Sequence, residues 1–245
     1  MENLIVVPDA ETLAQRGAEE FVARAAGAAA FRVALAGGGT PRRLYQLLAD
    51  AFRTRVAWER VHFFWGDERC LPHDHPESNF RMAREALLDP LGAPAANVHP
   101  VDTGLDAEAA ARAYQDEMAR VFGIPAAGPP PAFELVLLGL GPDGHTASLF
   151  PRNPALRERR AWAVGVHGAP KPPPERVTLT AVTINRARAV VFLVAGADKA
   201  EALAAVLEGP RDPERWPAQL VRPEGTLLWL VDEAAAGRLT GRREG

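Results

Sequence analysis

The sequence predicts an α/β fold: a doubly wound, largely parallel sheet flanked by helices on both faces. Short runs of β-branched and aliphatic residues alternate with alanine-rich stretches along most of the chain. This alternation is typical of strand–helix–strand units. Several strand-like runs, such as Leu135–Leu140, are apolar at consecutive positions rather than at every second one. Strands with both faces buried have this pattern, which favours a parallel sheet covered by helices.

The elements follow one another with recognisable boundaries. Asp9 is a suitable N-cap for the first helix, which we expect to run to about Ala30. Two proline-rich segments, 125–131 and 170–174, predict extended loops. The expected strands are Leu4–Val7, Val33–Ala36, Val61–Trp65, Leu135–Leu140, Val177–Val182, Val190–Val194 and Leu227–Val231, and the other expected helices are Pro41–Phe52, Ser78–Leu88, Ala107–Phe122, Lys199–Leu207 and Glu233–Leu239.

Length and composition restrict the class of protein. A chain of 245 residues that is 47% hydrophobic fits a single α/β domain over residues 1–245. With a net charge of -3 and no long basic run, nucleic acid is not an expected partner. No apolar stretch approaches the roughly 20 residues that span a bilayer, so we expect no membrane association. Cys70 is the sole cysteine and residues 1–8 lack signal-peptide features, which favours the cytoplasm.

The run Gly37-Gly-Gly-Thr-Pro41 follows a predicted buried strand and precedes a helix. We expect Thr40 at the N-cap and Pro41 at the first helical position. Glycines let the backbone approach a ligand closely, and the free amides at a helix start bind anions. These features favour phosphate binding over a plain strand–helix turn, which stays open as an alternative. No Gly-Lys-Ser/Thr follows, so this is not a P-loop.

Three charged residues, in Gly66-Asp-Glu-Arg69, follow the strand that ends at Trp65. Ligands of open α/β sheets bind beyond the carboxyl ends of the strands. Asp67 and Arg69 are therefore candidates for a functional role. An ordinary charged turn explains the same residues equally well.

The strongest candidate for catalysis is the glycine-rich segment Gly139–Pro151, which again follows an apolar strand. Its spacing matches Gly-x-Gly-x-x-Gly, but residues 161–167 lack the acid that a dinucleotide site requires. More informative are Asp143 and His145, two positions apart in the loop. A histidine without apolar periodic context and beside an acid has the properties of a general base.

Other reactive side chains offer less. Lys171 and Lys199 are the only two lysines. Lys199 lies in the predicted first turn of a helix that Asp198 can cap, where a lysine opposes the helix dipole unless an anion binds there. A solvated lysine remains an equal alternative. Cys70 is expected to be a bystander, and His73 and His75 lack a third ligand for a metal.

Together these loops resemble the 6-phosphogluconolactonase family, part of a wider sugar-phosphate isomerase superfamily. The most specific match is the run Asp143-Gly-His-Thr-Ala-Ser-Leu-Phe150. The other matching segments are Ala36–Pro41, Gly66–Arg69 with Ser78–Phe80, Arg176–Thr178 and Gly196–Lys199.

The resemblance implies hydrolysis of 6-phospho-D-glucono-1,5-lactone to 6-phosphogluconate without a metal or organic cofactor. It implies that His145 is the base, with Asp67 and Arg69 lining the same site. The implied partner is a small phosphosugar lactone, and we expect a monomer or a weak homo-oligomer. Phosphate contacts are implied for Gly38, Gly39, Thr40, Arg176 and Lys199.

The chemistry of these residue types agrees with that activity. A lactone is an activated ester, so water and a base suffice. We expect His145 to take a proton from the attacking water, with Asp143 or Asp67 orienting the imidazole or the sugar. Arg69 would stabilise the developing oxyanion, and remote phosphate contacts would position the ring.

Two alternatives remain open. A glucosamine-6-phosphate deaminase resembles a run reading Asp-Gly-His-Ile-Ala-Phe-Asn-Glu-Pro, in which a glutamate helps to activate the histidine. Here the corresponding residues 146–151 contain no acid, which disfavours ring opening and deamination. The second alternative is a non-catalytic sugar-phosphate sensor. The chain begins directly with the first predicted strand, without the helix-turn-helix segment that such regulators carry.

Overall fold

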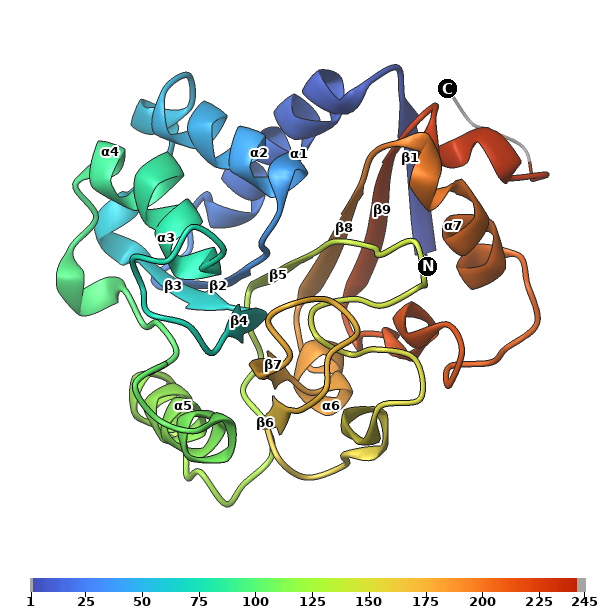
Figure 1. Ribbon diagram of the computed structural model, residues 1–245. Coiled ribbons are helices and arrows are strands. Elements are labelled where there is room, and N and C mark those ends of the chain that lie inside the picture. The colour runs from blue at the N-terminus through green and yellow to red at the C-terminus, as the bar shows by residue number, and fades with distance from the viewer. Residues whose placement is uncertain (1, 242–245) are drawn as a thin grey trace.

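The central sheet consists of parallel strands in the order β1-β9-β8-β5-β2-β3, seen in a computed structural model that describes residues 2–241 (Figure 1). The strands are β1 Glu2–Val7, β2 Phe31–Leu35, β3 Val61–Trp65, β5 Leu135–Leu138, β8 Ala189–Val194 and β9 Thr226–Asp232. The helices are α1 Ala10–Ala25, α2 Gly39–Ala49, α3 Asn79–Ala83, α4 Asp89–Leu91, α5 Ala107–Phe122, α6 Ala181–Asn185 and α7 Ala200–Leu207.

Both faces of the sheet are buried. In β5, Leu135 and Leu137 pack into the core formed with α1, α2 and α3, whereas Val136 and Leu138 pack into the opposite core with α5 and α7. Every residue of β5 is buried, so its continuous apolar run follows directly from this arrangement. The predicted doubly wound sheet is confirmed.

The order of the strands creates a crevice. From β2 the chain proceeds outward to β3, and it returns to the other side of β2 with β5. The connections that follow β2 and β5 leave in opposite directions, so the carboxyl ends of these two neighbouring strands flank a topological switch point. This is the usual place for a ligand in open α/β sheets. The loops that begin at Ala36 and Gly139 leave the sheet there.

A second, antiparallel sheet corrects the strand that we expected at Val177–Val182. That segment forms β7, Arg176–Leu179, followed by α6, and it pairs with β4, Asp67–Arg69, and β6, Ala163–Val166. The pairing of β4 with β7 gives Asp67–Arg69 extended backbone, so these residues do not form the charged turn that was the alternative explanation for them. These strands are three or four residues long, too short for a periodic signal to identify.

Several element boundaries also differ from expectation. Asp9 caps α1 as predicted, since its carboxylate accepts a hydrogen bond from the Thr12 amide at 2.8 Å. The helix ends at Ala25 rather than near Ala30, because Ala26 is extended and Gly27 adopts a φ of 72°. The expected terminal helix Glu233–Leu239 is only a 3-10 turn, Ala235–Arg238. Across residues 2–241 no helix has the length and apolarity needed to traverse a membrane.

Candidate active site

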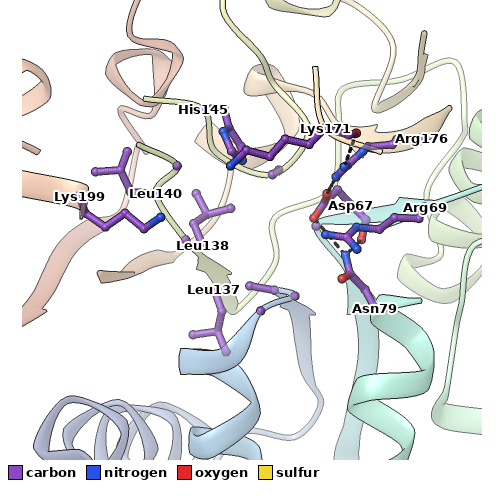
Figure 2. Close-up of a pocket in the computed structure, with 17 residues that line it drawn as sticks. Asp67, Arg69, Asn79, Leu137, Leu138, Leu140, His145, Lys171, Arg176 and Lys199 are labelled. Carbon is purple, nitrogen blue, oxygen red and sulfur yellow. Dashed lines mark hydrogen bonds and ion pairs between the residues drawn. The ribbon is translucent and has the colours of Figure 1, made fainter. Parts of the chain in front are cut away.

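A pocket of about 230 Å³ lies at the switch point (Figure 2). It is formed by the loops after β2, β3 and β5, together with β4, β7 and the start of the α7 region. The candidate segments that begin at Gly37, Gly66 and Gly139 therefore meet in one pocket. The predicted site residues that line the pocket are Gly38, Asp67, Arg69, His145, Arg176 and Lys199. Gly39, Thr40 and Asp143 lie outside its lining. Gly39 directly follows the lining residue Gly38, and Asp143 contacts the lining residue His145.

His145 and Asp143 form a hydrogen-bonded pair, in which Nδ1 of the imidazole contacts Oδ1 of Asp143. A carboxylate only accepts hydrogen bonds, so Nδ1 carries a proton, and in the neutral imidazole Nε2 is the nitrogen with the free lone pair. Burial tends to raise the pKa of Asp143, but the hydrogen bonds and charge of His145 outweigh it and lower that pKa to about 2. Asp143 is therefore ionised across the physiological pH range, and its contact with Nδ1 orients the ring with Nε2 away from the carboxylate.

The backbone of this loop is shaped around the pair. The His145 amide faces Oδ1 of Asp143, and the Gly141 amide donates to the carbonyl of His145 at 2.8 Å. A Cβ at Gly141 would lie 2.0 Å from Nδ1 of His145 and 2.6 Å from Oδ1 of Asp143. Position 141 thus requires glycine because the two catalytic candidates occupy the space of a side chain. On its other side the imidazole packs against Phe150, with ring centroids 4.6 Å apart.

Asp67 is buried and its carboxylate is already occupied. Oδ2 accepts a hydrogen bond from Ser148 Oγ at 2.6 Å and lies 4.0 Å from Nη1 of Arg176. The Asn79 side chain donates to the Asp67 carbonyl at 2.9 Å. Within the described residues His145 contacts Asp143 and not Asp67. Of the two acids that we considered, Asp143 is therefore the one that contacts the imidazole of His145, and Asp67 joins β4 to the Gly139–Pro151 loop.

The walls of the pocket are strongly cationic. Arg69 and Arg176 are directly opposite each other on β4 and β7. Like charges in such cross-strand positions repel, and Arg69 has no ion pair among residues 2–241. Lys171 and Lys199 add two ammonium groups, whereas Asp67 is the one carboxylate in the lining. Four cations around one carboxylate favour an anionic ligand.

The buried Arg176 guanidinium holds the proline-rich loop. Its Nε donates to the Pro173 carbonyl at 3.1 Å, and its Nη2 donates to the carbonyls of Lys171 at 3.0 Å and Pro172 at 3.3 Å. The guanidinium also lies over the Phe150 ring, 5.3 Å from its centroid. Most of its donors are thus used within the protein.

The start of α2 corrects our assignment of its cap. The helix begins at Gly39 with Gly38 at the N-cap, so Thr40 is the second helical residue and Pro41 the third. Gly38 has a φ of 106°, a conformation that only glycine adopts readily. No side chain caps the helix. The amides of Gly39 and Thr40 therefore remain available to an anion at the edge of the pocket.

The Lys199 region also differs in detail. Residues Ala197–Lys199 form a 3-10 turn and α7 begins at Ala200, so Asp198 does not cap the helix as expected. Asp198 instead pairs with Lys199, whose Nζ lies 2.8 Å from Oδ2. Lys199 still lines the pocket.

Two other kinds of site were considered from the sequence. Among residues 2–241 there is no group of three His, Cys, Asp or Glu side chains arranged to hold a metal ion. Cys70 is half-buried, and burial together with the charges of Glu175 and Glu68 raises the pKa of its thiol to about 11. The adjacent Arg69 does not produce a thiolate.

Sequence reasoning missed three residues that form part of this site. Lys171 and Asn79 line the pocket, and Phe150 packs on the base. Two signals were present in the sequence. Lys171 is one of only two lysines, and Phe150 stands where the deaminase run has its glutamate.

Comparisons with known proteins agree with this architecture. Residues 8–229 match the family model of glucosamine-6-phosphate isomerases/6-phosphogluconolactonase. A 6-phosphogluconolactonase of Synechocystis sp. is 49% identical over 210 residues, which cover 84% of each chain. The structure of the 6-phosphogluconolactonase from Trypanosoma brucei superposes with a TM-score of 0.86 at 32% identity, covering 98% of this chain and 99% of that one. A monomeric glucosamine-6-phosphate deaminase shares the fold, with a TM-score of 0.81 at 22% identity over 96% of this chain and 99% of that one.

Proposed function

The chain belongs to the family of glucosamine-6-phosphate isomerases and 6-phosphogluconolactonases, and on this premise we propose that it hydrolyses 6-phospho-D-glucono-1,5-lactone to 6-phosphogluconate with His145 as general base. The observation that carries the proposal is the Asp143–His145 pair at the edge of a pocket with four cationic side chains. Hydrolysis of a phosphorylated lactone requires a base that can take a proton from water, and it requires cationic groups that bind the phosphate. Nε2 of His145 and the cationic wall of the pocket meet these two requirements. The relatives named as 6-phosphogluconolactonases support the same substrate.

The reaction follows from the geometry of the pair. Nε2 of His145 accepts a proton from water as the water oxygen forms a bond to C1, and the carbonyl electron pair moves onto the carbonyl oxygen. As that pair returns, the bond from C1 to the ring oxygen breaks. The imidazolium then gives its proton to the ring oxygen, which restores neutral His145. Asp143 keeps its negative charge throughout and stabilises the imidazolium between the two proton transfers.

Lys199 and the first amides of α2 are the proposed contacts of the phosphate. Gly38 opens a helix start whose Gly39 and Thr40 amides lack side-chain acceptors, and these amides favour a phosphate oxygen. Arg176 contributes its charge to the same pocket. Binding energy at the phosphate positions the distant C1 for attack and so contributes to kcat as well as to KM.

The deaminase alternative is disfavoured by Phe150. In the deaminase run a glutamate takes the position of Phe150, and it helps to activate the histidine. Here an apolar ring packs against the imidazole, 4.6 Å between centroids, and Asp143 is its acidic partner. A histidine with a single acidic partner, here Asp143, is sufficient to activate water for attack on an activated ester.

Two further expectations belong to this proposal. We propose that the protein acts in the cytoplasm, which its single cysteine favours, and that it is a monomer or weak homo-oligomer. Size-exclusion chromatography with light scattering at micromolar concentration tests the second point, and a stable assembly larger than a dimer would contradict it.

The activity is tested by generating the lactone in place with glucose-6-phosphate dehydrogenase and following acid release above the spontaneous rate. We expect strong acceleration by this protein and no ammonia from glucosamine 6-phosphate. Ammonia release without lactone hydrolysis would establish the deaminase instead.

A further inference from the structure

The loop of residues 170–174 places Lys171 in the lining of the pocket. Three carbonyls of this loop bond to the guanidinium of Arg176, at distances of 3.0–3.3 Å. The Ala169 amide also donates to the Pro174 carbonyl at 3.0 Å, which closes the base of the loop. Prolines at 170, 172, 173 and 174 restrict its backbone further. The position of Lys171 is therefore determined by Arg176, a residue that is itself only 4% exposed.

The Lys171 side chain is free to contact a ligand. Figure 2 shows it extending from the loop toward His145, and both residues line the pocket. Among residues 2–241 the Lys171 ammonium has neither an ion pair nor a hydrogen bond. Its charge also adds to the larger effect of Lys199 in lowering the pKa of Asp198. In Figure 2 the end of the side chain lies at the side of the pocket where His145 lies.

Arg69, which we expected to stabilise the oxyanion, is placed differently. Its Nη1 donates to the Glu77 carbonyl at 2.6 Å, and in Figure 2 it lies with Asp67 and Asn79 rather than with His145. A cation that stabilises charge at C1 must lie near the group that activates the attacking water. Lys171 meets that condition better than Arg69.

We propose that Lys171 is a catalytic residue that binds the oxygen at C1 as it becomes negative, and that Arg176 is the positioning residue that holds Lys171 in place. This inference rests on the proposed function, since it assumes a lactone with C1 at His145. Lys171 donates a hydrogen bond and keeps its proton, so the proton transfers of His145 are unchanged. The same contact then binds the carboxylate of the product until it leaves.

A binding experiment isolates this contact without relying on turnover. Gluconate 6-phosphate and glucitol 6-phosphate differ at C1, where the first has a carboxylate and the second a hydroxymethyl group. We expect wild-type protein to prefer gluconate 6-phosphate by about 10-fold or more in calorimetry, as is typical of a charged hydrogen bond. Lys171→Met should remove most of this preference and leave the affinity for glucitol 6-phosphate within about 2-fold. The control Arg222→Met removes one exposed cation outside this pocket and should keep the preference.

Kinetics then test whether Arg176 acts through Lys171. Lys171→Met should lower kcat by about 10- to 100-fold with a smaller change in KM, and Lys171→Arg should recover part of the loss. Arg176→Lys cannot reproduce the fork that holds the loop, so it should have a similar effect. When Arg176→Lys is added to Lys171→Met, kcat should fall by less than about 2-fold below that of Lys171→Met alone, because the effects of residues that act as one unit are not additive. Circular dichroism identifies any variant that fails to fold. Because Lys171 is exposed, we expect its variants to fold normally.

Three outcomes would overturn the inference. The first is a Lys171→Met protein with normal kcat, a raised KM and weaker binding of inorganic phosphate, which would make Lys171 a phosphate ligand. The second is loss of the C1 preference in Arg69→Met but not in Lys171→Met. The third is full additivity of the Arg176 and Lys171 variants. Failure of wild-type protein to hydrolyse the lactone would refute the proposed function separately, since the binding preference is measured without turnover.

Discussion

Replacing Gly141 with alanine should displace the catalytic pair without touching the rest of the pocket. The new Cβ would lie 2.0 Å from Nδ1 of His145 and 2.6 Å from Oδ1 of Asp143. Non-bonded heavy atoms rest at roughly 3.5 Å or more, so the imidazole must retreat by more than about 1 Å or the loop must shift. A displacement of that size at a reacting group costs roughly 100-fold in rate. We therefore expect kcat to fall by about 10²-fold or more, up to the 10⁴-fold that a general base contributes.

The fold should survive this change. Overpacking typically costs about 1–3 kcal/mol, which lowers Tm by several degrees in a chain of this size. The coupled lactone assay gives kcat and KM after the spontaneous hydrolysis is subtracted, and KM should change little. Gly237→Ala is the matched control, because a Cβ there meets nothing within 4 Å. A folded Gly141→Ala protein with wild-type kcat would refute the assignment of His145 and Asp143 as a unit that depends on its geometry.

Three further predictions concern the remaining parts of the site. Lys199→Ala should raise KM by about 10-fold or more, as expected for a lost charged contact with the phosphate, with some loss of kcat; an unchanged KM would show that the phosphate end is assigned wrongly. Cys70→Ser should retain most of the activity, and iodoacetamide should label Cys70 slowly at pH 8, because a pKa raised to about 11 keeps the thiol protonated; trapping an acyl-enzyme on Cys70 would contradict this. EDTA should not inhibit, and activity that disappears with EDTA and returns with a divalent ion would show that a metal takes part.

The main sheet and the location of the site could be predicted from the sequence because their signals are local. The apolar run Leu135–Leu140 reports burial on both faces, and the strand-end rule brings the loops after β2, β3 and β5 together. Asp143 and His145 are two residues apart, so their pairing needed no long-range information. The structure adds the distinction between Asp143 and Asp67, which depends on Ser148, Asn79 and Arg176 occupying Asp67.

The rest of the site depends on long-range pairing that a single sequence does not reveal. The antiparallel sheet joins residues 67–69 to residues 176–179, more than 100 positions apart, in strands of three and four residues. That pairing sets Arg69 opposite Arg176 and brings the proline-rich loop over the pocket. Lys171 was conspicuous as one of two lysines, but only the hydrogen bonds of Arg176 to its loop explain why it lines the same pocket as His145.

The most direct test of the account is the kcat of His145→Ala in the coupled lactone assay, measured on protein shown by circular dichroism to be folded. The account predicts a loss of about 10²–10⁴-fold with a smaller change in KM, and no further loss when Gly141→Ala is added. A folded His145→Ala protein with near-normal kcat would contradict the assignment of His145 as the base.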